Sequence, residues 1–181
     1  MISLRACAVV LGAAVTLAGC ADRAVGIRPA AVAVAAAAAP AAGAPSSCRF
    51  HVDAIDDQRE GQDLGIMGPT RVSGEGFAAW FQKGIAAIPG HSLEPAPVRV
   101  RIAVAKAYIR GQSTLKSANI VVKVRLTDAQ GASTDKLYRG VENSTNWWNS
   151  EAEMQDAFDA ALADLRRQLA ADLAASCHGN S

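Results

Sequence analysis

Hydrophobic and polar residues alternate along several stretches of this chain, and that alternation predicts strands with one buried face. The residues Arg99, Arg101, Lys123 and Arg125 occupy the opposite, polar face of two of these stretches. A further strand is predicted at residues 136–142, after the turn residues 128–131. The apolar positions of the three alternating stretches are Phe50, Val52 and Ala54, then Val98, Val100, Ile102 and Val104, then Ile120, Val122, Val124 and Leu126.

Two other stretches repeat their apolar residues every three or four positions, which is the spacing of an amphipathic helix. The first begins near Ser73, and Pro89-Gly90 ends it. The second begins at Ser150, and Glu153 three residues later completes a capping box. The apolar positions are Phe77, Trp80, Phe81, Ile85 and Ile88 in the first helix, and Met154, Phe158, Leu162, Leu165, Leu169 and Leu173 in the second.

The order of these elements is β-α-β-β-β-α. It predicts an α+β fold in which two helices pack on one face of an antiparallel sheet of about four strands.

The N-terminus has the form of a bacterial lipoprotein signal. Arg5 supplies a basic start, residues 6–18 form an apolar stretch too short to span a bilayer, and residues 17–20 read Leu-Ala-Gly-Cys. This pattern predicts removal of residues 1–19 and lipidation of Cys20 with fatty acids such as palmitate. An ordinary cleavable signal followed by a chance cysteine is the alternative. Ala21 is not the aspartate associated with inner-membrane retention, so we expect the outer membrane, facing the periplasm.

Residues 20–47 are rich in alanine and proline and hold few charges, which is typical of a flexible linker. A single α+β domain is predicted at residues 48–181. Of the chain's 18 Lys and Arg and 17 Asp and Glu, only Arg5 lies in the signal, so the mature chain is formally neutral. A neutral chain lacks the basic face that nucleic-acid binding requires.

Four cysteines divide by position: Cys7 lies in the signal, Cys20 is the predicted anchor, and Cys48 and Cys177 lie at the two ends of the predicted domain. Because disulfides persist in exported proteins, we predict that Cys48 and Cys177 are bridged. Two separate buried thiols are the alternative.

Catalytic and metal-binding motifs are weak in this sequence. His51, His91 and His178 are far apart and follow no ligand spacing, so no metal or other cofactor is predicted. Gly74-Glu75-Gly76 lacks the third glycine of a nucleotide-binding loop. The acidic group at Asp53, Asp56 and Asp57 is interpreted as a solvated strand end. We therefore expect a protein that is not an enzyme.

Trp147 and Trp148 form the one candidate binding site. Neighbouring residues on an extended segment point to opposite sides, so we expect one tryptophan under the last helix and the other partly exposed. Exposed tryptophan is favoured at protein interfaces and membrane boundaries, and it stacks on sugars. Core packing, or a hydrophobic staple at the start of the helix, is the commoner explanation of such residues.

Several short motifs occur in a characteristic order after the lipobox: Asp57-Gln58-Arg59, then Lys106-Ala107-Tyr108, then Ser117-Ala118-Asn119-Ile120, then Tyr138-Arg139-Gly140. In this order, over residues 48–175, the sequence resembles the YajG-like family of bacterial envelope lipoproteins. That family has no established catalytic residues, so the resemblance implies an envelope location but no active site. Trp147-Trp148 and the Cys48/Cys177 pair depart from the family pattern.

These observations predict a membrane-anchored periplasmic lipoprotein that acts as a non-enzymatic binding or accessory module, with a protein or lipid partner. The first alternative is an accessory subunit of a lipid or lipopolysaccharide transport complex that uses a groove between sheet and helices. The second is an enzyme that acts on peptidoglycan.

Overall fold

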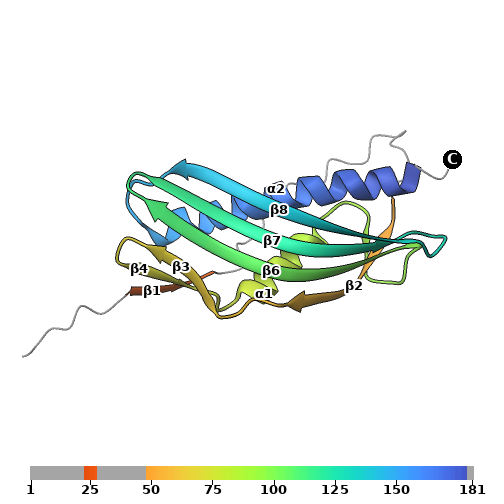
Figure 1. The fold of residues 1–181 in the computed structure, drawn as a ribbon, viewed down its shortest axis with the longest axis horizontal. Coiled ribbons are helices and arrows are strands. Elements are labelled where there is room, and N and C mark those ends of the chain that lie inside the picture. The colour runs from red at the N-terminus through yellow and green to blue at the C-terminus, as the bar shows by residue number, and fades with distance from the viewer. Residues whose placement is uncertain (1–22, 28–47, 179–181) are drawn as a thin grey trace, which may run out of the picture.

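The computed structural model describes residues 23–27 and 48–178 (Figure 1). Both predicted helices are present, together with eight strands. The helices are α1 (Phe77–Ala86) and α2 (Glu151–His178). The strands are β1 (Arg23–Gly26), β2 (Phe50–Asp57), β3 (Asp63–Met67), β4 (Thr70–Ser73), β5 (His91–Ser92), β6 (Val98–Gln112), β7 (Leu115–Thr127) and β8 (Ser133–Thr145).

The sheet is larger and more mixed than the sequence predicts. All eight strands belong to one sheet, and four of its seven pairings are parallel: β1 with β4, β2 with β5, β2 with β6, and β3 with β6. Only β3–β4, β6–β7 and β7–β8 are antiparallel. The prediction of an antiparallel sheet of about four strands is therefore wrong.

The error in strand direction has a physical cause. The connection from β2 to β6 contains β3, β4, α1 and β5. A crossover connection of this kind makes the two strands that it joins parallel. Hairpins, by contrast, join β6 to β7 and β7 to β8, which makes those two pairs antiparallel. The alternation in the sequence reports buried faces but not the direction of neighbouring strands.

Strand β6 is the centre of the sheet, and two strands share one of its edges. The first half of β6 pairs with β2, and its last residues pair with β3 through Gly65 and Ile109. A register shift between Val104 and Lys106 keeps the apolar side inward along the whole strand. Before the shift even-numbered residues such as Val104 are buried, and after it Ala107 and Ile109 are buried.

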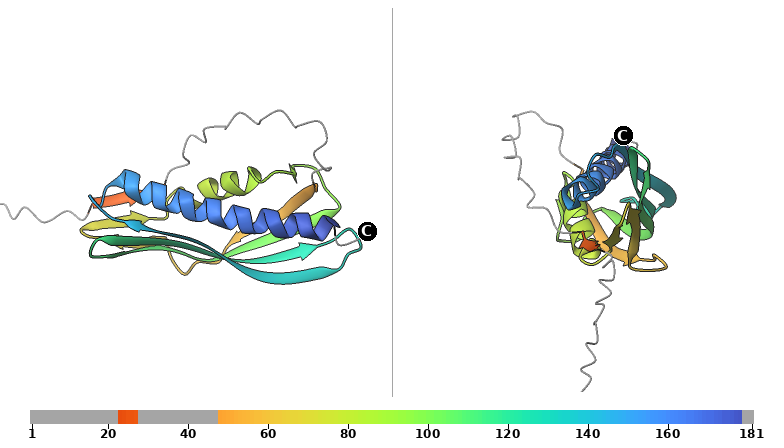
Figure 2. Two further views of the ribbon diagram at one scale, coloured as in Figure 1. Left: turned by 90° about the horizontal axis from the view of Figure 1, so that it is seen from above. Right: turned by 90° about the vertical axis from the view of Figure 1, so that its left-hand side faces the viewer.

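Helix α2 lies along the long strands and closes the core. With 28 residues it spans about 42 Å, close to the length of β7 and β8. Seen along the long axis, the sheet curls around both helices (Figure 2). Gly140 of β8 allows α2 to approach closely, since a Cβ there would lie 2.1 Å from the Ala161 carbonyl oxygen. The two helices meet where the Trp80 indole Nε1 donates to the Asp159 carboxylate at 2.7 Å.

Side chains of α2 also cover the outer strand of the long hairpins. Among the described strands β8 pairs with β7 alone, so one edge of β8 carries backbone groups without a strand partner. The Val141 amide donates to the Asp164 carboxylate at 3.2 Å, and the Gln168 amide nitrogen donates to the Arg139 carbonyl oxygen at 2.9 Å. The helix therefore satisfies part of this edge.

Strand β1 falls within the predicted linker, and the structure differs from that prediction at these residues. Arg23–Gly26 pairs in parallel with Thr70–Ser73 of β4, and Val25 and Ile27 are buried. Gly76, just before α1, has φ of 80° and lies so near this segment that a Cβ would be 2.5 Å from the Ile27 carbonyl oxygen. The folded unit thus begins ahead of residue 48.

The short motifs noted in the sequence make structural contacts. The Arg59 guanidinium pairs with Asp57 at 2.7 Å and lies 4.1 Å from the centre of the Phe77 ring. Arg139 donates to the Asn119 side-chain oxygen at 3.0 and 2.5 Å, which ties β8 to β7. These motifs therefore stabilise the fold.

Candidate functional site

The connection between β8 and α2 carries two exposed tryptophans. We call residues Asn146–Asn149 the tryptophan turn. Trp147 is 74% exposed and Trp148 is 83% exposed. The expectation that one of them packs under the last helix is wrong, and so is the alternative that both are core or staple residues. Both side chains are instead exposed at the surface.

Glu153 in the first turn of α2 holds this segment in place. Its carboxylate accepts hydrogen bonds from the backbone amides of Trp147 and Trp148, each at 3.0 Å, and from that of Ser150 at 3.1 Å. The bonds to the backbone amides of Ser150 and Trp147 contribute most to lowering the pKa of Glu153 to about 2. The Glu153 amide in turn donates to the Ser150 hydroxyl at 3.2 Å, which confirms the predicted capping box.

The two asparagines that frame the tryptophans fix the shape of the turn. The Asn146 amide nitrogen donates to the Asn149 side-chain oxygen at 2.7 Å, and the Asn146 backbone amide donates to the Thr114 carbonyl at the same distance. Asn149 has φ of 50°, a left-handed conformation that asparagine tolerates better than most residues. The tryptophans are thus displayed from a hydrogen-bonded turn.

A buried lysine completes the support. Lys116 is 7% exposed and donates to the Thr145 carbonyl oxygen at 2.7 Å, while its ammonium lies 3.9 Å from the Glu153 carboxylate. Each charge lies near an opposite one, so neither is left uncompensated beneath the turn. The sequence indicates the Ser150–Glu153 pair, but no local pattern shows that Lys116 meets it, because that contact depends on the register of β7 with β8.

Other apolar side chains lie at the same end of the molecule, which we call the tryptophan end. It comprises the β6–β7 turn, the β3–β4 turn, the start of β1, the end of β8 and the start of α2 (Figure 1). Leu115 is 57% exposed and pairs with Thr145, and Ile66 of β3 is 52% exposed. Four of the six large apolar residues exposed in the described part of the chain therefore lie here.

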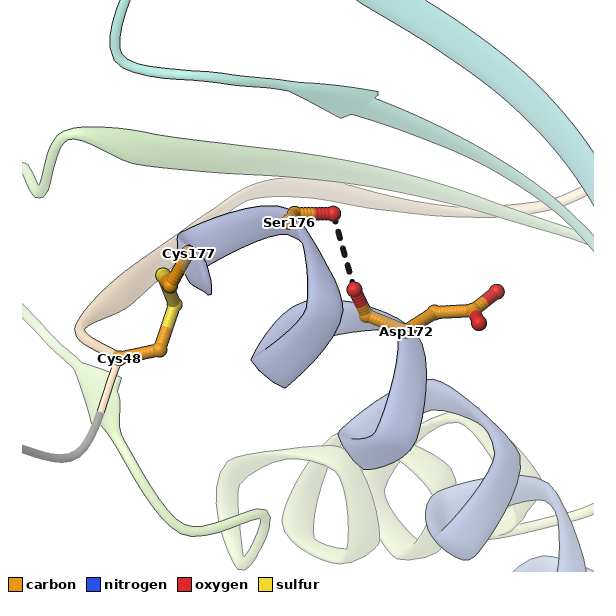
Figure 3. Close-up of a disulfide and its surroundings, with 4 residues drawn as sticks. All are labelled: Cys48, Asp172, Ser176 and Cys177. Atoms are coloured by element: carbon orange, nitrogen blue, oxygen red, sulfur yellow. Dashed lines mark hydrogen bonds between the residues drawn. A yellow bond between two sulfur atoms is a disulfide. The ribbon is translucent and has the colours of Figure 1, made fainter. Parts of the chain in front are cut away.

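The structure contains the predicted disulfide at the opposite end. Cys48 and Cys177 are joined, with Cα atoms 5.9 Å apart, so the segment before β2 is linked to the last turn of α2 (Figure 3). Both cysteines pack against the core. Ser176 beside the disulfide donates its hydroxyl to the Asp172 carbonyl oxygen at 2.8 Å. We call this the disulfide end.

The predicted lipidation site and signal lie outside the described residues: Cys20 and residues 1–19 are not among them. Cys20 precedes Arg23, the first residue of β1, by three positions. Within the described part of the chain, no helix has both the length and the apolar character needed to cross a membrane.

Several of the acidic residues and histidines considered as candidate sites make contacts within the fold. Asp53 pairs with Arg99 at 2.8 Å and Asp57 pairs with Arg59, whose hydrogen bond lowers the pKa of that carboxyl. His51 and His91, far apart in sequence, come onto neighbouring strands because β5 pairs with β2. Burial, with the nearby His51, lowers the pKa of His91. The described residues contain no group of three or more side chains suited to hold a metal.

The space between sheet and helices is filled. Phe158 and Leu165 of α2 are fully buried, and a Cβ on Gly84 of α1 would lie 2.3 Å from the Leu162 side chain. A cavity of about 510 Å³ lies instead on the other face of the sheet, where charged residues such as Arg101 and Lys123 line it. A lipid-binding groove between sheet and helices is therefore not favoured by this packing.

No protein-family model and no curated protein sequence matches the chain. Its structure is similar to that of a predicted lipoprotein from Caulobacter crescentus, with 19% identity, a TM-score of 0.41, and coverage of 52% of this chain and 78% of the other. It is similar to a Xanthomonas campestris protein of family DUF330, with 12% identity, a TM-score of 0.47 and coverage of 69% and 82%. A minor lipoprotein from Acinetobacter baumannii shows 14% identity, a TM-score of 0.40 and coverage of 72% and 94%.

Proposed function

We propose that this chain is a lipoprotein of the bacterial cell envelope that acts as a non-enzymatic binding module. Cys20 anchors it to the outer membrane, and the folded unit faces the periplasm. The lipobox supports the anchor, and the residue after it supports the outer membrane. Membership of the YajG-like family stays a prediction.

The tryptophan turn is the observation that carries the proposed binding role. Proteins seldom leave large aromatic side chains in water without a use, and here two successive tryptophans are 74% and 83% exposed. The turn is held by hydrogen bonds from Trp147 and Trp148 to Glu153, so little conformational entropy is lost when it binds. Rigid aromatic residues of this kind are typical hot spots.

The ionisable groups with shifted pKa values support binding over catalysis, since each makes a structural contact. Asp172 accepts hydrogen bonds from Lys136 at 2.8 Å and from Tyr138 at 2.5 Å, and these bonds lower its pKa. Burial and the bond to Asp172 raise the pKa of Tyr138. The pKa of Glu153 is lowered chiefly by hydrogen bonds from the backbone amides of Ser150 and Trp147, and these bonds hold the tryptophan turn.

Fractionation of the Cys20→Ala variant tests the anchor. We expect an unprocessed or soluble exported form, while the wild-type protein fractionates with outer membranes. A variant that is processed and found in membranes like the wild type contradicts the proposed anchor.

Site-specific photocrosslinking in cells tests the binding surface. A photoreactive amino acid at position 147 or 148 is expected to capture an envelope component, either a protein or a lipid. The same probe at Leu93 is the matched control, because that residue is 88% exposed but lies beside β5 near the disulfide end. Equal capture from both ends, or none from the tryptophan turn, contradicts the proposal.

A further inference from the structure

We propose that the tryptophan turn docks on the lipid bilayer that holds Cys20, so that the molecule stands on the membrane with its tryptophan end down. This proposal rests on the proposed function, because it requires the lipid anchor. The binding partner of the two exposed tryptophans is then the membrane itself.

The position of β1 carries the argument. Arg23, the first residue of β1, pairs with Thr70 at the β3–β4 turn. Arg23 comes three positions after Cys20, and a chain of that length reaches at most about 11 Å. The lipidated cysteine is therefore restricted to the neighbourhood of the β3–β4 turn, although the whole linker would have allowed a much longer reach if residues 20–47 had been free.

The β3–β4 turn in turn contacts the tryptophan turn. Gly68, two residues from Thr70, lies so close to Asn149 that a Cβ on the glycine would be 3.1 Å from the Asn149 side-chain nitrogen. Asn149 directly follows Trp148. The anchor and the exposed tryptophans are thus connected by one strand pairing and one packed contact, both at the same end of the molecule.

The composition of this end fits the boundary of a bilayer. Tryptophan is enriched at the membrane interface, where its ring lies among the lipid headgroups and its N–H reaches water. Leu115 and Ile66 add apolar area at the same end. The opposite end bears the disulfide and the β7–β8 turn, whose residues 128–131 are polar or small. An interfacial contact beside the lipid anchor adds a second attachment to the bilayer.

Tryptophan fluorescence of the lipidated full-length protein tests the proposal. The protein is reconstituted into vesicles of phosphatidylethanolamine and phosphatidylglycerol, with or without bromine atoms on the acyl chains. The chain has three tryptophans and the third, Trp80, is only 4% exposed in the core. We expect brominated lipids to remove roughly half of the emission, because bromine quenches the two interfacial rings but not the buried one.

Matched variants assign the quenching. Trp147→Phe with Trp148→Phe leaves Trp80 as the only tryptophan, and its emission is expected to be the same in brominated and ordinary vesicles. Each single Trp→Phe variant reports one ring. Because both side chains are exposed, these variants are expected to fold, and circular dichroism checks that they do.

The outcomes separate the two proposals. Wild-type protein that floats with the vesicles but shows no quenching overturns bilayer docking and leaves the anchor in place, with the tryptophans free for a protein partner. Protein that does not float with vesicles overturns the Cys20 anchor and the docking with it. Quenching that persists in the double variant shows that the signal comes from Trp80, and it also overturns the docking.

Discussion

Removal of the disulfide between Cys48 and Cys177 is expected to cost this protein a large part of its stability. The bridge joins residues 129 positions apart, so it restricts nearly the whole folded chain when the protein unfolds. In the chain-entropy model, closing a loop of this length stabilises the fold by about 5 kcal/mol. A small domain has a total stability of about 5–15 kcal/mol, so this is a substantial share.

Urea unfolding of the chain from Ala21 onward, followed by circular dichroism, measures this loss. With a slope of about 2 kcal/mol per molar urea, the Cys48→Ala, Cys177→Ala double variant should unfold at a midpoint lower by about 2.5 M. Its slope should also rise, because the unfolded chain is no longer cross-linked. Reduction of the wild-type protein is the matched control and should give the same shift. A midpoint change below about 0.5 M with an unchanged slope would refute the reasoning, since it would mean that the bridge barely restricts the unfolded state.

Three further substitutions test contacts within the fold. Gly140→Ala places a Cβ 2.1 Å from the Ala161 carbonyl oxygen and should lower the free energy of unfolding by about 2–3 kcal/mol. The control Gly61→Ala should be nearly neutral, because nothing lies within 4 Å of its added Cβ. Equal effects of the two variants in urea unfolding contradict this account. Glu153→Gln should lower the melting temperature at neutral pH. The pKa of Glu153 is about 2 in the folded protein against an ordinary 4.5, so the contribution of its carboxylate to stability is complete above about pH 4.5 and is lost as the pH falls toward 2. The difference in melting temperature between variant and wild type should therefore narrow over that range. A difference that stays constant disproves the assignment. Arg59→Lys keeps the charge but loses the planar group over the aromatic ring, and should cost about 1 kcal/mol in urea unfolding; wild-type stability in this variant would show that the stacking contributes nothing.

The sequence predicts the elements whose signals are local. The capping box at Ser150 and Glu153, both helices and the alternation in β6 and β7 all depend on residues a few positions apart, and the structure contains them. The disulfide could also be predicted, because Cys48 and Cys177 are the two cysteines left once the predicted signal and anchor are set aside, and the predicted compartment favours disulfides.

What the sequence does not predict depends on long-range pairing. Strands β3 and β4 have only five and four residues, which is too short for an alternating pattern to identify them. Strand β1 lies in alanine-rich sequence and exists only because β4 offers an edge. The direction of β2 relative to β6 follows from the crossover through α1, which no periodicity reports.

The candidate site shows the same division. The tryptophan pair is visible in the sequence, but its exposure is not, because whether a ring is buried depends on where α2 starts relative to the sheet. The connection between Cys20 and the tryptophan turn depends on β1, on Thr70 and on the contact of Gly68 with Asn149. None of these can be predicted without the strand order.

The contacts of Asp164 and Gln168 with the outer edge of β8 have a consequence for proteins held on a surface. Molecules confined to one membrane leaflet meet one another far more often than molecules in solution, because tethering raises their effective concentration. An open strand edge under such crowding is a template for sheet-to-sheet polymerisation. By occupying backbone groups of β8 with its own side chains, α2 makes that edge a poor partner for a second copy. Helix α2 therefore protects this edge from pairing with a second copy, in addition to packing against the core.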